Sequence, residues 1–505
     1  MRIVNRNESI SNLDCDILGL MVREGQNIDS QLLELDNKLP PALMQALQAL
    51  VVSDNFKAKP GECLVLVTMG QIAAKKLILV GLGKRANTQS IRRASGNLAR
   101  KCRSLEGLRQ VCLSANEAGL DAGCIPLSVV QAMVEGWLLG SYSFDKYKTQ
   151  KESLDRLPLD ELAIVGLSIK EKAFVQATDA GRAIAEATNL SRSLIAEPAM
   201  FMTPSQLAQE ALEVASTHDI SCQIFEKADM EKLGMGAFLG VAQGAKQPPK
   251  FVVMNYRHPK AKKTIAIVGK GITFDSGGLS LKNPQSMETM KYDMSGAACV
   301  IGVMKATGVL KPEVSILGIF AATENMPGGQ ALHPGDVLVA ANEKTIEVNN
   351  TDAEGRLILA DALCYAVKMG PDEVIDIATL TGACVTALGT VCAGIMGSEQ
   401  SLIDRLIKAG DEAGEKLWQL PLFDEYKDSL KSDIADLKNA GSGGKAGSSC
   451  AGMFLQEFVG GCPWAHLDIA GPGWFDQEKD ECNKGGTGFG VRTLCHYIMK
   501  EASLS

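Results

Sequence analysis

The chain has 505 residues, too many for one ordinary hydrophobic core, so we expect about two or three domains. Hydrophobic residues make up 46% of it and charged residues 22%, a balance that excludes a disordered or fibrous protein. The 50 glycines suit the many turns of an α/β enzyme. A formal net charge of −8 argues against a protein whose main task is to coat nucleic acid, because phosphate binding needs a dominant cationic surface.

The cysteines and the apolar stretches point to a cytoplasmic protein. Fourteen cysteines are spread over the chain without a CxxC pair, which indicates reduced, buried thiols rather than a disulfide scaffold. The first ten residues, MRIVNRNESI, lack the apolar core of a signal peptide. The most membrane-like stretch, Val374 to Gly397, contains Asp376, and we interpret it as a buried strand followed by a helix of small residues. We therefore expect no membrane contact.

The first part of the chain alternates apolar runs with a helical pattern. Strands are expected at Ile17 to Val22, Cys63 to Thr68, Lys76 to Gly81 and Leu162 to Gly166, with a helix at Gln89 to Cys102. This alternation predicts a compact N-terminal α/β domain over residues 1–168. Lys170 to Ala196 is rich in alanine and free of proline, so we expect a long connecting helix within residues 169–198.

The second part, residues 199–505, repeats the strand and helix rhythm with fully apolar strands. They are expected at Phe251 to Met254, Thr264 to Val268, Val314 to Ala321, Val374 to Ala378 and His466 to Ile469. Continuous apolar strands separated by helices indicate a mainly parallel sheet covered by helices on both faces. The fold class is therefore α/β, with two α/β domains joined by a long helix.

Two features of the first part suggest nucleotide chemistry only weakly. The segment Gly81-Leu-Gly83-Lys-Arg-Ala86 matches a loose dinucleotide fingerprint, but a plain glycine turn is the favoured interpretation. Eight Lys and Arg residues lie between Lys84 and Arg109, and here a solvated helix face is favoured. A DNA-binding or scaffold protein whose enzymatic activity is secondary stays open as the alternative function.

The strong signal consists of charged residues near strand ends. Lys270 and Asp275 are expected in the loop that leaves the strand Thr264 to Val268, and Asp293 lies just before a helix of small residues. Asp352 and Glu354 follow another predicted strand and are expected on one side of an extended segment. The carboxyl ends of parallel strands are where open α/β sheets bind ligands.

Four carboxylates in one cleft would repel one another unless cations neutralise them. Carboxylates can bridge two divalent ions about 3.5–4 Å apart, and such a pair activates a shared water. The competing interpretation makes each acid a helix N-cap. From the residues alone, the pattern predicts a metal-assisted hydrolase or a phosphoryl-transfer enzyme, and a phosphoesterase is not excluded.

The blocks around these residues carry a family resemblance. Asn350-Thr-Asp352-Ala-Glu354-Gly-Arg356-Leu357 resembles the signature of the leucyl aminopeptidases, the cytosol aminopeptidase family (peptidase family M17, bacterial aminopeptidase A type). Four further blocks agree in order, namely Val268 to Gly278, Lys291 to Met294, Ile377 to Gly382 and Trp464 to Gly471. The likeness is close from about Ile195 onward. It also implies a macro-like fold for the smaller N-terminal domain.

The resemblance implies a set of residue roles. Two divalent ions per subunit, manganese or zinc with magnesium or cobalt as options, would be held by Lys270, Asp275, Asp293, Asp352 and Glu354. Lys282 would polarise the scissile carbonyl, and Arg356 would hold a bicarbonate ion that acts as general base. The first side chain of the substrate would meet Met290, Thr379 and Ala470, while Leu380 would contact the peptide through its backbone.

The same resemblance implies the reaction and the assembly. A metal-bridged hydroxide would remove the N-terminal residue of a peptide, preferably a leucine-like or methionine-like residue, and cysteinylglycine is a further expected substrate. The partners are then peptide substrates, and the expected assembly is a homohexamer, a dimer of trimers. Nucleic acid stays an open partner through the basic segment.

Overall fold

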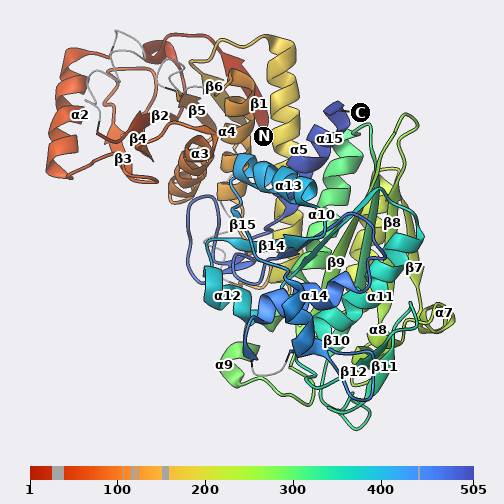
Figure 1. Ribbon diagram of the computed structural model, residues 1–505. Coiled ribbons are helices and arrows are strands. Elements are labelled where there is room, and N and C mark those ends of the chain that lie inside the picture. The colour runs from red at the N-terminus through yellow and green to blue at the C-terminus, as the bar shows by residue number, and fades with distance from the viewer. Residues whose placement is uncertain are drawn as a thin grey trace. The chain divides into compact units, whose positions relative to one another are not determined.

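The computed structural model describes residues 1–25, 39–105, 107–114, 120–121, 124–149, 159–441 and 444–504. The chain divides into two compact units. The N-terminal unit comprises Met1–Glu186 with Glu478–Asn483, and the C-terminal unit comprises Ala187–Gln477 with Lys484–Ser505. Each unit is a sheet flanked by helices, which confirms the predicted α/β class (Figure 1). The helix α5 (Glu171–Ala196) agrees with the predicted connecting helix, whereas the domain limits at residues 168 and 198 stay predictions.

The N-terminal unit is built on a six-stranded sheet in the order β1-β6-β5-β2-β4-β3, parallel except for the antiparallel pair β3 and β4. Its strands are β1 (Arg2–Arg6), β2 (Ile17–Arg23), β3 (Cys63–Val67), β4 (Lys76–Gly83), β5 (Gln110–Ser114) and β6 (Glu161–Val165). Its helices are α2 (Pro41–Ser53), α3 (Thr88–Arg103) and α4 (Pro126–Ser141), with a short 3₁₀ turn, η1 (Ile10–Asn12). Leu43 and Leu47 of α2 pack on one face, and Leu98 of α3 and Trp137 of α4 pack on the other.

The glycine motif and the basic segment of this unit have structural explanations. Gly81 and Gly83 are strand residues of β4 that pair with β2, so they do not form a phosphate-binding turn before α3. Most arginines of the basic segment contact groups within the same unit. Their partners are Glu135 for Arg92, Asp480 for Arg93, the Cys482 carbonyl for Arg100, the Tyr142 carbonyl for Arg103 and Asp160 for Arg109.

The C-terminal unit is built on an eight-stranded sheet in the order β15-β14-β17-β13-β9-β10-β8-β7. Its four central strands, β17, β13, β9 and β10, run parallel, and antiparallel pairs flank them. The strands of this sheet are β7 (Ser221–Phe225), β8 (Lys250–Tyr256), β9 (Thr264–Asp275), β10 (Ser315–Asn325), β13 (Glu373–Ala378), β14 (Ala393–Gly397), β15 (Leu417–Gln419) and β17 (Trp464–Asp468). Smaller sheets contain β11 (Val337–Val339), β12 (Thr345–Glu347), β16 (Leu437–Lys438), β18 (Trp474–Phe475) and β19 (Gly485–Gly486).

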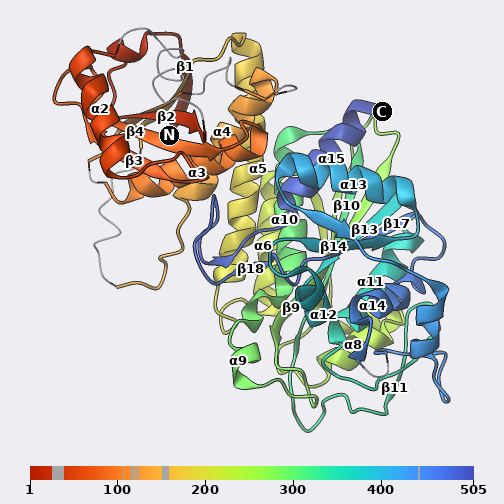
Figure 2. The same ribbon diagram turned by 60° about the vertical axis from the view of Figure 1, so that its left-hand side comes forward.

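Helices cover both faces of the large sheet (Figures 1 and 2). One face packs against α8 (Gly236–Ala242), α11 (Glu354–Lys368) and α14 (Gly447–Gln456). Helices on the other side are α6 (Pro204–Thr217), α10 (Ser295–Leu310), α13 (Gln400–Ala413) and α15 (Val491–Leu504). Shorter helices are α7 (Lys227–Lys232), α9 (Pro284–Met287), η4 (Met290–Met294), α12 (Gly382–Leu388) and η5 (Asp424–Leu430).

Two apolar stretches of this unit fold as strands and helices, and α12 within the first of them is mostly exposed or half-buried. The stretch from 374 to 397 folds as β13, α12 and β14, which confirms the predicted strand followed by a helix of small residues. Within the described residues, one helical stretch, Met290–Leu310, is long and apolar enough to cross a membrane by length and composition. Of its apolar window, 83% is buried inside the protein.

Strand β9 is longer than the sequence predicted. It runs to Asp275 instead of ending near Val268, because its second half continues to pair with β10 up to the partners Asn325 and Asp275. Lys270 and Asp275 therefore project from a strand and not from the loop that follows it. The pairing with β10 holds these side chains more rigidly than a loop would.

The contact between α3 and α4 generates a prediction about stability. A Cβ atom on Gly136 would lie closer than 3.0 Å to the Arg92 carbonyl oxygen, because the two helix backbones touch there. We expect Gly136→Ala to lower the free energy of unfolding by about 1–3 kcal/mol through overpacking. Gly382→Ala, at a helical glycine with nothing within 4 Å, is the control. Urea unfolding checks this, and equal midpoints for the two variants would contradict it.

Candidate metal and catalytic site

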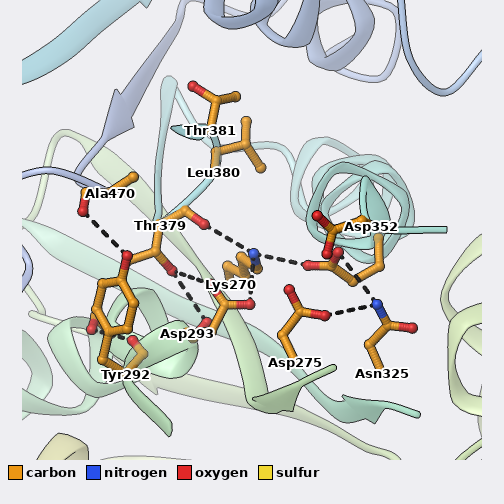
Figure 3. A network of polar contacts seen from close by, with 12 residues as sticks. Lys270, Asp275, Tyr292, Asp293, Asn325, Asp352, Thr379, Leu380, Thr381 and Ala470 are labelled. Carbon is orange, nitrogen blue, oxygen red and sulfur yellow. Dashed lines mark hydrogen bonds and ion pairs between the residues drawn. The ribbon is translucent and has the colours of Figure 1, made fainter. Parts of the chain in front are cut away.

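Six charged side chains meet where the central strands end. Lys270 and Asp275 come from β9, Asp293 from η4, and Glu354 from the first residue of α11. Lys282 and Asp352 come from the loops that follow β9 and precede α11. Figure 3 shows Lys270 among the acidic side chains.

Two lysines compensate the four carboxylates. The Lys270 Nζ lies 2.8 Å from Asp293 Oδ2 and 2.9 Å from Glu354 Oε1, and it donates a hydrogen bond of 2.9 Å to the Thr379 carbonyl oxygen. The Lys282 Nζ lies 2.8 Å from Asp275 Oδ2 and 2.6 Å from Asp352 Oδ1. Each lysine thus bridges two acids that are distant in sequence.

The Lys270 side chain fits against α11 because the second residue of that helix, Gly355, has no side chain. A Cβ atom on Gly355 would lie within 3.0 Å of the Lys270 side chain, so any larger residue would displace the amine. Gly355 is helical and does not form a turn before the helix. Asp352 and Glu354 also do not share one extended segment, because Asp352 lies in a turn and Glu354 already belongs to the helix.

Helix capping does not explain the acids. The N-cap of α11 is Ala353 and the N-cap of α10 is Met294, and neither helix has a side-chain cap. Within the described residues, Asp275, Asp293 and Glu354 instead form a group whose ligand oxygens all lie within 4.8 Å of one another. Asp352 stands just outside this group, and its side chain keeps 33% of its surface exposed.

Burial and mutual repulsion shift the pKa values of the site. Burial raises the pKa of Asp275 to about 6, and the nearby charge of Glu354 contributes. Burial also raises the pKa of Asp293 well above its usual range, although Lys270 acts against it. Burial opposes ionisation of Glu354 too, but Lys270 and Lys282 outweigh it and lower its pKa. For Lys270, burial lowers the pKa, yet the carboxylates around it prevail and raise it.

Three buried carboxylate oxygens of the site are available to bind cations. Asp293 Oδ2, Asp352 Oδ1 and Glu354 Oε1 are buried, and they accept no well-directed hydrogen bond from the part of the chain that is described. They are balanced only by the charges of the two lysines. Buried oxygens without directed donors are suited to bind a metal ion.

Arg356 is a buried cation without an acidic partner. Its side chain donates one hydrogen bond, from Nη1 to the Asn439 carbonyl oxygen at 2.9 Å, while its Nε has no acceptor in the described structure. Burial lowers the pKa of Arg356 to about 10, although the charge of Glu354 acts against this. A guanidinium in this state has a donor left for a small anion.

The comparisons with known proteins decide the family. A model of the catalytic domain of the cytosol aminopeptidase family matches residues 189–495, and a model of that family's N-terminal domain matches residues 22–151. The chain belongs to the cytosol aminopeptidase family. It is therefore a metallopeptidase, a hydrolase of peptide bonds, as the sequence predicted.

Relatives of this cytosol aminopeptidase family member match it over nearly its whole length. A probable cytosol aminopeptidase of Alkaliphilus oremlandii is 43% identical over 99% of both chains, and one of Thermosynechococcus vestitus is 45% identical over 90% of this chain and 91% of its own. A solved tomato leucine aminopeptidase mutant has a TM-score of 0.88 at 34% identity, covering 99% of this chain and 96% of its own. The bottromycin maturation enzyme BotP, solved in complex with Mn, has a TM-score of 0.83 at 33% identity. The match covers 97% of this chain and 100% of the BotP chain.

The expected pocket residues lie beside the charged group. Thr379 donates its hydroxyl to Asp293 Oδ1 at 2.7 Å, and Leu380 follows it directly. The Ala470 carbonyl oxygen accepts a hydrogen bond of 3.3 Å from the Tyr292 hydroxyl (Figure 3). Met290 begins the 3₁₀ helix that carries Asp293.

Sequence reasoning missed one polar neighbour that fixes the acids. Asn325 Nδ2 donates to Asp275 Oδ1 at 2.8 Å, to the Thr351 carbonyl at 3.0 Å and to Glu354 Oε2 at 3.5 Å. Asn325 is the last residue of β10, opposite Asp275. The predicted strand ended at Ala321, four residues before Asn325, because the extent of β10 depends on its pairing with β9.

Metal binding at this site is expected to weaken below about pH 6, because the pKa of Asp275 is raised to about 6 and its protonated form cannot coordinate. Apparent affinity falls about tenfold for each pH unit below that value. The measurement is the rise in melting temperature on adding Mn²⁺ at about pH 7.5 and about pH 5. Each melt is compared with its metal-free counterpart, which removes the pH dependence of the fold itself. Equal rises at both pH values would contradict the expectation.

Proposed function

We propose that this metallopeptidase is a leucyl aminopeptidase that uses two divalent metal ions to remove the N-terminal residue from peptides. The observation that carries the proposal is the buried group of Asp275, Asp293 and Glu354 with Lys270 packed among them. A phosphoesterase would share the carboxylates but would have no use for a buried lysine in this position. Within the proposal, cysteinylglycine is a further substrate.

The donor set fits two ions. Asp275, Asp352 and Glu354 would hold the tighter one, and Lys270 and Asp293, with Asp275 and Glu354 shared, would hold the exchangeable one. Oxygen donors with one amine accept manganese, zinc, magnesium or cobalt. The related BotP structure with Mn supports manganese. When bound, the two ions supply Lewis acidity and an activated water.

Lys270 can act as a ligand only as a neutral amine, so it must give up the proton that the surrounding acids stabilise. A divalent cation beside it would lower its pKa, because two positive charges repel. The Thr379 carbonyl accepts one N–H of the Lys270 amine at 2.9 Å. This bond would orient the lone pair of the neutral amine.

Lys282 would stabilise negative charge on the scissile carbonyl oxygen. Its side chain is fixed between Asp275 and Asp352, at the open side of the group, and 15% of its surface is exposed. A preorganised cation whose field does not have to be assembled during the reaction is an effective source of transition-state stabilisation.

Asp293 and Arg356 complete the reaction. Asp293, held by the Thr379 hydroxyl, would receive the free α-amine of the substrate. Arg356, which has no acidic partner in the described chain, would hold a bicarbonate ion that takes a proton from the attacking water. The first side chain would lie against Met290, Thr379 and Ala470, an apolar lining that favours leucine-like and methionine-like residues with modest selectivity.

The main test is hydrolysis of leucine p-nitroanilide by metal-stripped full-length protein after each ion is returned. Asp352→Ala and Glu354→Ala are expected to lose more than about a hundredfold in kcat/KM, beyond the loss typical of outer-shell partners. Glu324→Gln is the matched control, because Glu324 is the neighbour of Asn325 on β10 and projects to the opposite side. N-acetyl-leucine p-nitroanilide should not react. Full activity of both alanine variants would sink the proposal.

A second prediction concerns Lys282. Lys282→Met keeps the length of the side chain but removes its charge, so kcat should fall by about 10²–10³ while KM changes little. Steady-state kinetics with leucine p-nitroanilide measure this. A variant that lost only substrate affinity would show that Lys282 acts in binding and not on the reacting carbonyl.

A further inference from the structure

Asp468 is a buried carboxylate behind the candidate pocket. It is the last residue of β17 and has 0% exposure. Its Oδ1 accepts hydrogen bonds from the backbone N–H groups of Leu380, Thr381 and Ala470 at 3.2, 3.4 and 3.2 Å. Its Oδ2 accepts the Thr381 hydroxyl at 2.6 Å. All four groups can donate, and a carboxylate, which only accepts, matches all of them.

We propose that Asp468 is a positioning residue of the aminopeptidase site, which fixes the orientation of Lys270 and Asp293 through the two loops that it joins. The proposal rests on the proposed function, because it assigns these two side chains to the exchangeable metal ion. Asp468 itself touches neither the acids nor the lysines of the site.

The first connection passes through a single peptide group. The N–H of Leu380 and the C=O of Thr379 belong to one planar trans peptide unit, so they point in opposite directions. The N–H donates to Asp468, and the C=O accepts the Lys270 amine. Holding the N–H therefore sets the direction of the carbonyl, and the carbonyl sets the direction of the amine.

The same loop and its neighbour also act on Asp293. The Thr379 hydroxyl donates to Asp293 Oδ1, so the residue whose carbonyl orients the lysine also orients the acid. On the other side, Ala470 donates its N–H to Asp468 and accepts the Tyr292 hydroxyl through its carbonyl. Tyr292 directly precedes Asp293 in η4. Both connections from Asp468 lead to the pair that would hold the exchangeable ion. Figure 3 shows their far ends, the contacts of Thr379 with Lys270 and Asp293 and that of Ala470 with Tyr292.

If Asp468 only stabilised the fold, its loss would reduce stability and leave the metal ligands in place. Asp361 is the control residue for that outcome. Asp361 is also fully buried, and it accepts the backbone N–H groups of Phe238 and Ala341 at 2.8 Å each. These groups belong to α8 and to the segment after β11. Loss of the Asp361 carboxylate should therefore reduce stability without redirecting Lys270 or Asp293.

The experiment is calorimetric titration of Mn²⁺ into metal-stripped full-length protein, together with thermal unfolding. Asp468→Ala is expected to weaken the lower-affinity site by about 10–100-fold, the range for outer-shell partners, and to leave the higher-affinity site nearly unchanged. Asp468→Asn, which keeps one oxygen for the three N–H groups, should recover most of the affinity. Asp361→Asn should lower the melting temperature and leave both Mn²⁺ affinities unchanged.

Wild-type Mn²⁺ affinities in Asp468→Ala would overturn the proposal. If that variant does not fold, Thr381→Val tests the same connection. It removes the hydroxyl that donates to Oδ2, together with the contacts of that hydroxyl with the Cys384 N–H and Ser448. It should weaken the lower-affinity site severalfold, while Thr381→Ser, which keeps the hydroxyl, should not. Unchanged affinity in Thr381→Val would then overturn it. If the unaltered protein binds two Mn²⁺ ions but does not hydrolyse leucine p-nitroanilide, the proposed function fails, while the binding series still decides the role of Asp468.

Discussion

The C-terminal unit depends on the compensation of negative charge at the ends of its central strands. Asp275, Asp293 and Glu354 are each almost fully buried, and burial without a cation would cost far more than their hydrogen bonds return. In the metal-free protein Lys270 and Lys282 supply positive charge, and each lies between two acids. The same arrangement suits a divalent ion, because ligand oxygens of Asp275, Asp293 and Glu354 lie within 4.8 Å of one another.

The fold supplies this arrangement by bringing together residues far apart in the chain. Strand β9 provides a lysine and an acid, β10 ends with Asn325 beside Asp275, and α11 begins with Glu354. Gly355 leaves the space that the Lys270 side chain fills. Behind them, β17 ends in Asp468, which joins the loops that line the pocket. Strand β9, the 3₁₀ helix η4 and the start of α11 hold Lys270 and the buried acids, and loops hold Lys282 and Asp352.

The N-terminal unit uses its charges differently. The basic segment from Lys84 to Arg109 is rich in cations, but most of its arginines pair with acids or carbonyl groups of the same unit. Arg92 is fully buried against Glu135 between two helices. Cations engaged in this way stabilise the packing of α3 and contribute less to an outward electrostatic field. A basic run in sequence is therefore a weak indicator of a basic surface.

The sequence by itself determined the α/β class, the connecting helix, the central strands and the charged residues of the site, because periodicity and residue type are local properties. It could not place Asp275 in a strand, since the length of β9 depends on pairing with β10. It also could not find Asn325, Tyr292 or Asp468, whose roles are hydrogen bonds between distant segments. Only the tertiary structure decided which lysine meets which acids, because strand register and helix packing set those distances.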